Sequence, residues 1–430
     1  MKTKFAWSVL VILLAACGSE QGGTGELPTP PEPPVPPGPP QLNISLSYEP
    51  AKPLARQEVK FRLEAEGVEP SSDWRCSLDL GVPGVPSRNV DCSSGEFSAV
   101  FPVPGYFKPE LVVYPAGKPQ AAAGVEVEVT DCNGPDWDTT GEFDGRLSGW
   151  YVGAGGCLYD PAEYELEEVP AIMPVYGLYS DDLVWNVNGF TTKVWQAFIE
   201  GGTMADGMGA PVVGIFNPTG EAQQELSTAF EVDNSISKEV ADLALARLLA
   251  GKTVTINGAS QGGIHISQAA SLIMAGLDEA GLSAEDKAAA LARLRLQTTG
   301  GFGSDFPEGP RYIHYANRLD AIPQWVGMTS SGAQLKPGMI LATYEGQGPQ
   351  CFEYRNRYDD GVWLPPYFTG PRGNLPPIPI GLDGTKHDAC LYNLHLMDYE
   401  RVWNCAKPGE GVALSLDQDA PACLEPRVKN

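Results

Sequence analysis

Two patterns of hydrophobic and polar residues divide the chain after its first 40 residues. Residues 41–131 contain short runs in which apolar and polar side chains alternate, separated by Pro, Gly and Ser, and this predicts a small β-sandwich. Residues 181–430 instead alternate apolar strands with helical stretches, which predicts an α/β domain with a mostly parallel, doubly wound sheet. Residues 132–180 show neither pattern, so we expect an irregular connector there.

The first 40 residues have the composition of an export signal followed by a linker. Two lysines precede an apolar run that is too short for a lasting transmembrane helix, so residues 1–16 are predicted to be a signal peptide. The end of this run, "LAAC", resembles the lipobox of bacterial lipoproteins. The resemblance implies that Cys17 is lipidated and that Gly18 after it favours the outer membrane. Residues 17–40, rich in Gly and Pro, are then an extended linker that holds the folded part away from the lipid.

Charge and cysteine content restrict the partners and the compartment. The formal charge of -25 at neutral pH repels phosphate backbones, so nucleic acid is not expected as a partner. Eight cysteines remain besides Cys17, an even number that predicts disulfides in an oxidising compartment. Cys390 and Cys405 are predicted on one helix, about 22 Å apart, so they cannot pair with each other. Order along the chain favours the pairs Cys76–Cys92, Cys132–Cys157, Cys351–Cys390 and Cys405–Cys423.

The stretch "NGASQGG" carries the strongest candidate chemistry. It follows the apolar strand "KTVTI" and precedes a predicted helix, and Ser260 lies between Gly258 and Gly262. This pattern and its position match the nucleophile elbow of α/β hydrolases, a turn so tight that the residues two before and two after the serine must lack side chains. The chain is therefore similar to lipase-like serine hydrolases from residue 181 onward. The resemblance implies a Ser-His-Asp triad, acting on esters without metal or cofactor.

The triad needs an acid and a base downstream of Ser260. "NRLDAIP" resembles the loop that carries the acid in lipase-like members, which implies Asp320; Asp305, after the preceding predicted strand, is the alternative. Of the four histidines, His265 and His314 are expected to be structural residues on a helix and a strand. The base is therefore predicted to be His387, at the start of a helix, with His395 as the alternative.

The oxyanion of the reaction needs two hydrogen-bond donors. The resemblance implies the backbone N–H of Gln261 as one donor. "NVNGF" is similar to the corresponding loop of hydrolases, which implies the N–H of Phe190 as the other, with "FNPTG" as a second choice. A long aromatic segment before His387 is expected to cover the site or to line an acyl pocket through Trp363, Tyr367 and Phe368.

The "FSAVFPVPGYFKPELVVY" stretch in residues 41–131 is similar to the closing hairpin of polycystic-kidney-disease-type (PKD) and other immunoglobulin-like modules. Such modules commonly act as spacers or weak binders. The sequence thus predicts a lipid-anchored serine hydrolase of the cell envelope, acting on an ester or lipid. The alternative is a non-catalytic adhesion or binding lipoprotein that keeps the hydrolase scaffold. Hydrolysis and acyl transfer to an alcohol use the same triad, and the choice between them stays open.

Overall fold

The computed structural model describes a two-part arrangement of strands and helices in residues 42–416. The described residues are 42–82, 85–117, 119–132, 147–175, 177, 180–189, 192–218, 235–318, 320–344, 402–404 and 411–416. Residues 41–430 belong to one compact unit, which contains both parts. Among the described residues, no helix is both long and apolar enough to cross a membrane.

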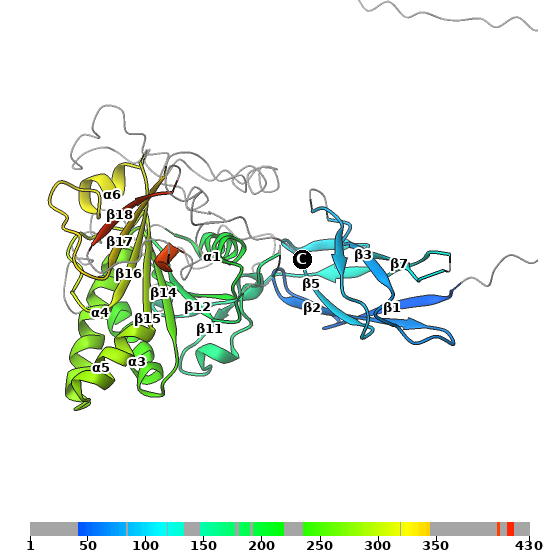
Figure 1. The fold of residues 1–430 in the computed structure, drawn as a ribbon, viewed down its shortest axis with the longest axis horizontal. Coiled ribbons are helices and arrows are strands. Elements are labelled where there is room, and N and C mark those ends of the chain that lie inside the picture. Colours follow the sequence, from blue (N-terminus) through cyan, green and yellow to red (C-terminus); the bar gives the residue numbers. More distant parts are fainter. Residues whose placement is uncertain are drawn as a thin grey trace, which may run out of the picture. The chain divides into compact units, whose positions relative to one another are not determined.

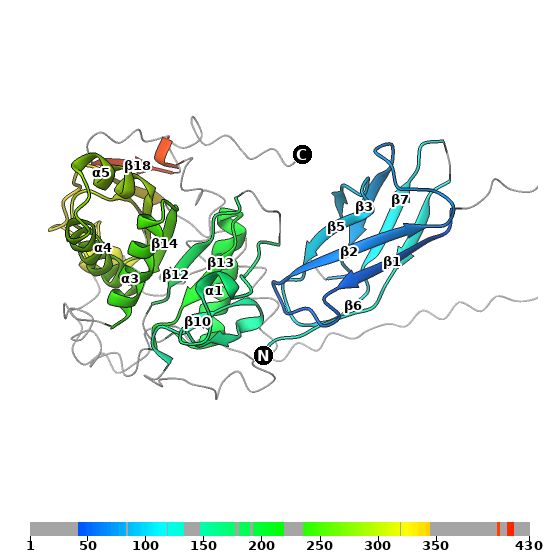
Figure 2. The same ribbon diagram turned by 90° about the horizontal axis from the view of Figure 1, so that it is seen from below.

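The first part is a β-sandwich. One sheet has the antiparallel order β1-β2-β5, and the other has the order β4-β3-β7-β8, with a two-stranded β6-β9 sheet beside them (Figure 2). Along β2 every second residue is buried, so Val59, Phe61 and Leu63 point into the core. The strands are β1 (Ile44–Glu49), β2 (Glu58–Ala65), β3 (Arg75–Asp79), β4 (Arg88–Val90), β5 (Glu96–Val100), β6 (Gly105–Phe107), β7 (Glu110–Tyr114), β8 (Ala121–Gly124) and β9 (Val127–Val129).

The second part is built around a nine-stranded mixed sheet with the order β11-β10-β13-β12-β14-β15-β16-β17-β18. β10 pairs antiparallel with β11 and β13, and every other pair of neighbours is parallel. The strands are β10 (Tyr151–Val152), β11 (Leu158–Tyr159), β12 (Val184–Val187), β13 (Val212–Ile215), β14 (Val254–Ala259), β15 (Leu294–Thr299), β16 (Arg311–Asn317), β17 (Met339–Tyr344) and β18 (Val412–Ser415).

Helices cover both faces of this sheet. Val184 and Val212 pack in one apolar cluster with α1, whereas their neighbours Trp185 and Val213 pack in a second cluster with α3 and α4. Figure 1 shows α1 on one side of the sheet and α3, α4 and α5 on the other. The helices are α1 (Val194–Met208), α3 (Ser235–Leu249), α4 (Gly262–Glu279), α5 (Ala284–Arg293) and α6 (Ala321–Val326), with short 3-10 helices η3 (Ala154–Gly156) and η4 (Leu166–Glu168).

Most predicted elements are present, and the differences are local. The β-sandwich and the parallel strands from residue 184 to residue 344 follow the hydrophobic pattern. The predicted irregular connector is not irregular throughout, because β10 and β11 lie within residues 132–180 and extend the large sheet. Each of these strands has only two residues, which is too short for a periodic pattern to be visible. The hydrophobic pattern does not indicate β4, β6, β8 or β18 either.

Two predicted disulfides are confirmed. Cys76 of β3 pairs with Cys92, which lies two residues after the neighbouring strand β4, and Cys132 pairs with Cys157. The other predicted pairs, Cys351–Cys390 and Cys405–Cys423, lie outside the described residues, as does Cys17.

Candidate active site

Ser260 lies on a strained turn between β14 and α4. Its φ is 51°, in the left-handed region that residues with a Cβ rarely adopt, and Arg56 is the only other non-glycine residue of the described chain with a positive φ. Hydrogen bonds hold this conformation: the Ser260 N–H donates to the Thr299 carbonyl (3.0 Å), and the Ser260 carbonyl accepts from the N–H groups of Gly263 (3.0 Å) and Phe302 (2.8 Å). Such strain persists where the surrounding structure fixes it, often at functional sites.

The glycines of the turn are required by close backbone approach. A Cβ on Gly258 would lie 2.4 Å from the carbonyl oxygen of Gly262, and a Cβ on Gly262 would lie 2.2 Å from that of Val187. A Cβ on Gly263 would lie 2.6 Å from the carbonyl oxygen of Phe302. All of these neighbours are main-chain atoms, which cannot rotate away as a side chain can. The geometry therefore agrees with the steric reason for expecting glycine on both sides of Ser260.

The loop after β12 lies directly against Ser260. A Cβ on Gly189 would lie 2.8 Å from the Ser260 Cβ and 3.3 Å from its Oγ, so only glycine permits this approach. Phe190, the predicted second oxyanion donor, is outside the described residues. Gln261, the predicted first donor, is the N-cap residue of α4. Its N–H is thus at the helix end where the dipole favours negative charge.

Three buried amide side chains connect the loops around Ser260. The Asn188 Oδ1 accepts from the Asn217 N–H (2.8 Å), and the Asn188 Nδ2 donates to the Asn217 carbonyl (3.0 Å). The Asn217 Nδ2 donates to the Gln261 Oε1 (2.9 Å). All three side chains are buried. The cluster therefore ties the ends of β12 and β13 to the residue that follows Ser260.

The role of Asn217 in this cluster is not evident from the sequence, in which "FNPTG" is only a second choice for an oxyanion donor. The available signal was an Asn directly after each of two consecutive apolar strands, "VWNVN" and "VVGIFN". Only the parallel pairing of β12 with β13 brings the two strand ends side by side.

The two candidate acids differ sharply in environment. Asp320 is fully buried, and its Oδ1 accepts from the N–H of Ile322 (2.8 Å) at the start of α6. Asp305 is 95% exposed and forms an ion pair with the Nζ of Lys336 (2.9 Å). An acid that orients a catalytic histidine is buried and hydrogen-bonded, so Asp320 has the environment that this role requires.

The two described histidines are buried structural residues. The Nδ1 of His265 is 3.1 Å from the Ser237 Oγ, and the Nδ1 of His314 is 3.0 Å from the Thr298 Oγ1. Burial lowers the pKa of His265 to about 4 and that of His314 to about 3, because desolvation disfavours the charged ring. Both rings are therefore neutral at physiological pH, as expected for core histidines. His387 and His395 lie outside the described residues, as does the aromatic segment with Trp363, Tyr367 and Phe368.

Ser260, Asn188, Asn217 and Asp320 all lie at one edge of the sheet. Each follows the carboxyl end of a parallel strand, namely β14, β12, β13 and β16. In open parallel sheets, ligands bind outside this edge. Within the described part of the chain, no group of three His, Cys, Asp or Glu side chains is arranged to hold a metal ion.

Comparison with known proteins identifies no family for the chain. No family model matches it, and neither does any curated protein sequence. A solved β-sandwich carbohydrate-binding module is 16% identical over 24% of this chain and 42% of its own, with a TM-score of 0.19. The PKD domain of the human receptor SorCS2 is 17% identical over 27% of this chain and 94% of its own, with a TM-score of 0.18. A xyloglucanase of Bacteroides ovatus is 11% identical over 71% of this chain and 72% of its own, with a TM-score of 0.20.

Proposed function

We propose that the protein is a serine hydrolase of the α/β-hydrolase class that cleaves carboxylic esters. One observation carries this proposal: Ser260 has a left-handed backbone on a strand-to-helix turn whose flanking glycines admit no side chain. A serine has no structural need for this conformation, which glycine adopts at lower cost. A strained serine at the ligand-binding edge of a parallel sheet is the arrangement of a nucleophile elbow.

The positions of the other groups support the same proposal. In hydrolases of this class the chain order is nucleophile, acid and base, and an oxyanion donor comes from a loop after an earlier strand. Here Ser260 follows β14, the Gly189 loop follows the neighbouring β12, and Asp320 follows β16. The candidate bases His387 and His395 come after β17, which preserves that order.

In the proposed mechanism, the base takes the proton of the Ser260 hydroxyl while the Oγ attacks the ester carbonyl. Asp320 orients the imidazole and stabilises its charged form. The N–H groups of Gln261 and Phe190 hold the oxyanion of the tetrahedral intermediate. The protonated base then gives its proton to the leaving alcohol, and an acyl-enzyme remains. Water, activated by the same base, attacks the acyl-enzyme and releases the acid and the Ser260 hydroxyl.

We also propose that the enzyme acts at the cell envelope. The lipobox-like "LAAC" and the linker of residues 17–40 favour a lipid anchor on Cys17, with the outer membrane as its site. An anchored esterase meets lipids and other esters close to the membrane surface, which makes such molecules the expected substrates. Metabolic labelling with a fatty-acid analogue checks the anchor: wild type should be labelled and Cys17→Ala should not.

Labelling with a fluorophosphonate tests the nucleophile. The full-length protein should be labelled at Ser260, Ser260→Ala should not, and the control Ser271→Ala, which changes an exposed serine of α4, should behave as wild type. If folded wild type is not labelled, or Ser260→Ala is labelled equally, the hydrolase proposal is wrong and a non-catalytic binding lipoprotein becomes the better interpretation. His387→Ala and His395→Ala then separate the bases, because only one of them should abolish turnover of a short-chain ester.

A further inference from the structure

Arg56, in the β-sandwich, makes a buried ion pair with helix α1 of the α/β part. Its Nη2 donates to the Asp206 Oδ2 (2.8 Å), and its Nη1 donates to the Asp206 Oδ1 (3.1 Å) and the Met173 carbonyl (3.3 Å). The Asp206 Oδ1 also accepts from the Val175 N–H (2.7 Å). The side chains of Arg56 and Asp206 are only 1% and 2% exposed. A bidentate pair with these additional bonds is the geometry in which buried charges are compensated.

The sequence of α1 is adapted to this contact. Glycine disfavours a helix, yet α1 has the consecutive pair Gly201 and Gly202 in its interior. A Cβ on Gly202 would lie 2.4 Å from the Arg56 Nε, and a Cβ on Gly201 would lie 2.8 Å from the Ile172 Cδ1. The two glycines therefore provide the space in which Arg56 and Ile172 pack against the helix. Arg56 itself has a φ of 60°, so the turn that presents it is strained as well.

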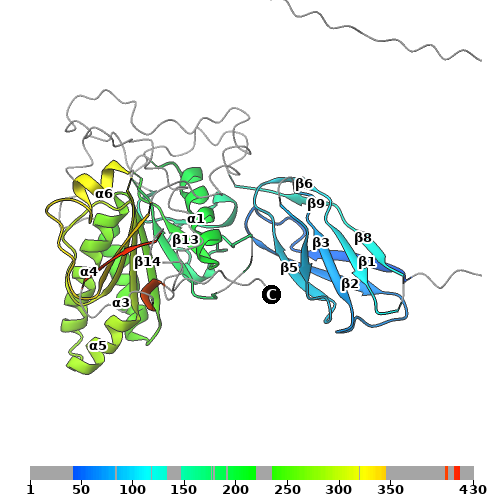
Figure 3. The same cartoon turned by 45° about the horizontal axis from the view of Figure 1, so that its top comes forward.

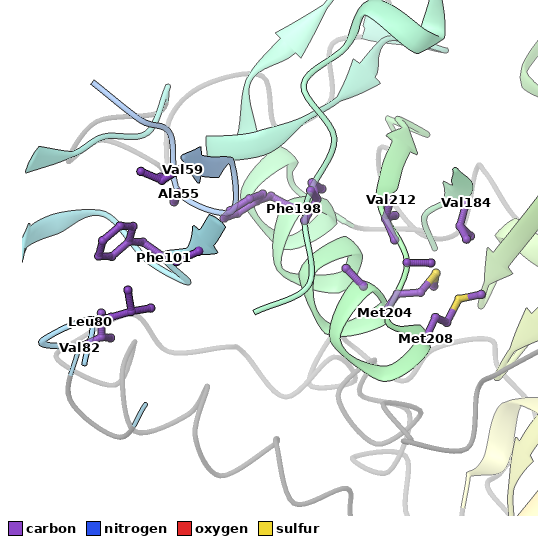
Figure 4. Packing of buried hydrophobic residues seen from close by; sticks show 14 of the residues in the cluster. Ala55, Val59, Leu80, Val82, Phe101, Val184, Phe198, Met204, Met208 and Val212 are labelled. Atoms are coloured by element: carbon purple, nitrogen blue, oxygen red, sulfur yellow. The ribbon is translucent and has the colours of Figure 1, made fainter. Parts of the chain in front are cut away.

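Backbone bonds, a disulfide and apolar packing reinforce the same contact. The Ala55 carbonyl accepts from the Gly155 N–H (2.8 Å), and the Arg56 carbonyl accepts from the Met173 N–H (2.8 Å). Cys132, just after the last sandwich strand, is covalently joined to Cys157 next to β11. Figure 4 shows Phe198 of α1 near Ala55 and Phe101 of the sandwich, and all three belong to one apolar cluster. Figure 3 shows α1 and the sandwich strands in the ribbon of the whole chain, turned by 45° from the view of Figure 1.

We infer that Arg56 is a positioning residue for the α/β part, and that the β-sandwich is a structural component of that part instead of an independent spacer. Arg56 fixes α1 through Asp206. The helix in turn begins five residues after Gly189, the residue that lies against Ser260. In the middle of α1, the Glu200 Oε1 accepts from the Asn186 Nδ2 (3.1 Å) at the end of β12. The sandwich therefore supports the helix that follows the proposed oxyanion loop, and the effect on reactivity rests on the proposed function.

Hydrogen exchange on the full chain tests this inference without reference to catalysis. In Arg56→Met, the loss of the buried ion pair to Asp206 should raise the exchange rate of the α1 amides about tenfold or more, while the amides of α3 on the opposite face change little. The melting temperature should fall by about 5–10 °C. The matched control is Arg62→Ala, which removes an ion pair of the same type to Glu96, with both side chains 65% exposed, and it should change neither quantity.

Two further variants keep the result decisive. Arg56→Met with Asp206→Leu removes both charges and should restore the α1 exchange rate to within about threefold of wild type. Arg56→Lys keeps the charge but loses the bidentate geometry, so α1 exchange should still rise; it replaces Arg56→Met if that variant does not fold. Unchanged α1 exchange in the folded single variant, or an equal rise in α1 and α3, overturns the inference.

The fluorophosphonate reaction rate adds the functional readout. It should fall in Arg56→Met and stay at the wild-type value in Arg62→Ala. A wild type that is not labelled at all refutes the proposed hydrolase but leaves the exchange result to judge the role of Arg56. A labelling rate that is unchanged while α1 exchange rises refutes the link from the sandwich to Ser260.

Discussion

Replacing Gly262 by alanine tests the turn that holds Ser260. The new Cβ would lie 2.2 Å from the carbonyl oxygen of Val187, whereas an ordinary contact is at least 3.4 Å, so one of the two atoms must move by 3.4 − 2.2 = 1.2 Å. Overpacking costs about 1–3 kcal/mol where side chains can adjust. Here the obstacle is the main chain of β12, a central strand paired on both sides. We therefore expect Gly262→Ala to lower the free energy of unfolding by about 3 kcal/mol, which corresponds to a fall in melting temperature of about 6 °C or more.

The assay is thermal unfolding followed by fluorophosphonate labelling of the folded protein. The control is Gly332→Ala, since a Cβ on Gly332 would meet nothing within 4 Å and its φ is not in the left-handed region. This control should melt within about 1 °C of wild type. Gly262→Ala should also be labelled more slowly, because any shift of the turn moves the Ser260 Oγ relative to the proposed base and oxyanion donors. Equal stability and equal labelling of the two variants would refute the steric argument.

Three other predictions concern buried polar groups. Asn217→Ala should slow labelling about tenfold and lower the free energy of unfolding by about 1–3 kcal/mol, because it removes the Nδ2 that donates to the buried Gln261 Oε1, whereas exposed Asn43→Ala should do neither. Equal rates would exclude a positioning role for the Asn217 side chain. Burial lowers the pKa of His265 to about 4, below its unfolded value near 6.5, so the unfolded chain binds the proton first and stability falls as pH drops from 7 to 5, by about 2 kcal/mol for this group. Urea unfolding at both pH values should show a smaller fall for His265→Gln, and an identical fall would contradict the burial argument. Burial raises the pKa of Glu239 to about 7, above its unfolded value, so the stability that the protonated carboxyl provides is lost as pH rises through 7. In urea unfolding, Glu239→Gln should therefore be more stable relative to wild type at pH 8 than at pH 5. A variant that is less stable relative to wild type at pH 8 than at pH 5 would contradict this argument.

The sequence alone determined the order of elements and the most unusual turn. The alternation of residues in β2, and the apolar runs of β12 to β17, follow directly from which faces must be buried, so their existence could be predicted. The turn at Ser260 could be predicted because Gly258 and Gly262 are needed for a local reason: a Cβ at either position would collide with nearby main-chain atoms. The pairs Cys76–Cys92 and Cys132–Cys157 were also predictable, since each closes a short loop along the chain.

Only the tertiary structure decided what brings distant residues together. The pairing of β12 with β13 places Asn217 beside Asn188. Asp320 is buried whereas Asp305 is exposed, a difference between the two candidate acids that the sequence does not show. Two-residue strands also extend the sheet within the expected connector. The bond between Arg56 and Asp206 joins residues 150 positions apart in the chain. In the sequence, Gly201 and Gly202 indicate only a low helix propensity, and the structure shows that Gly202 leaves space for Arg56. A hydrophobic pattern records which side of an element is buried, but it does not record which element covers that side. Partner choice between polar groups far apart in the chain therefore appears only when the fold is known.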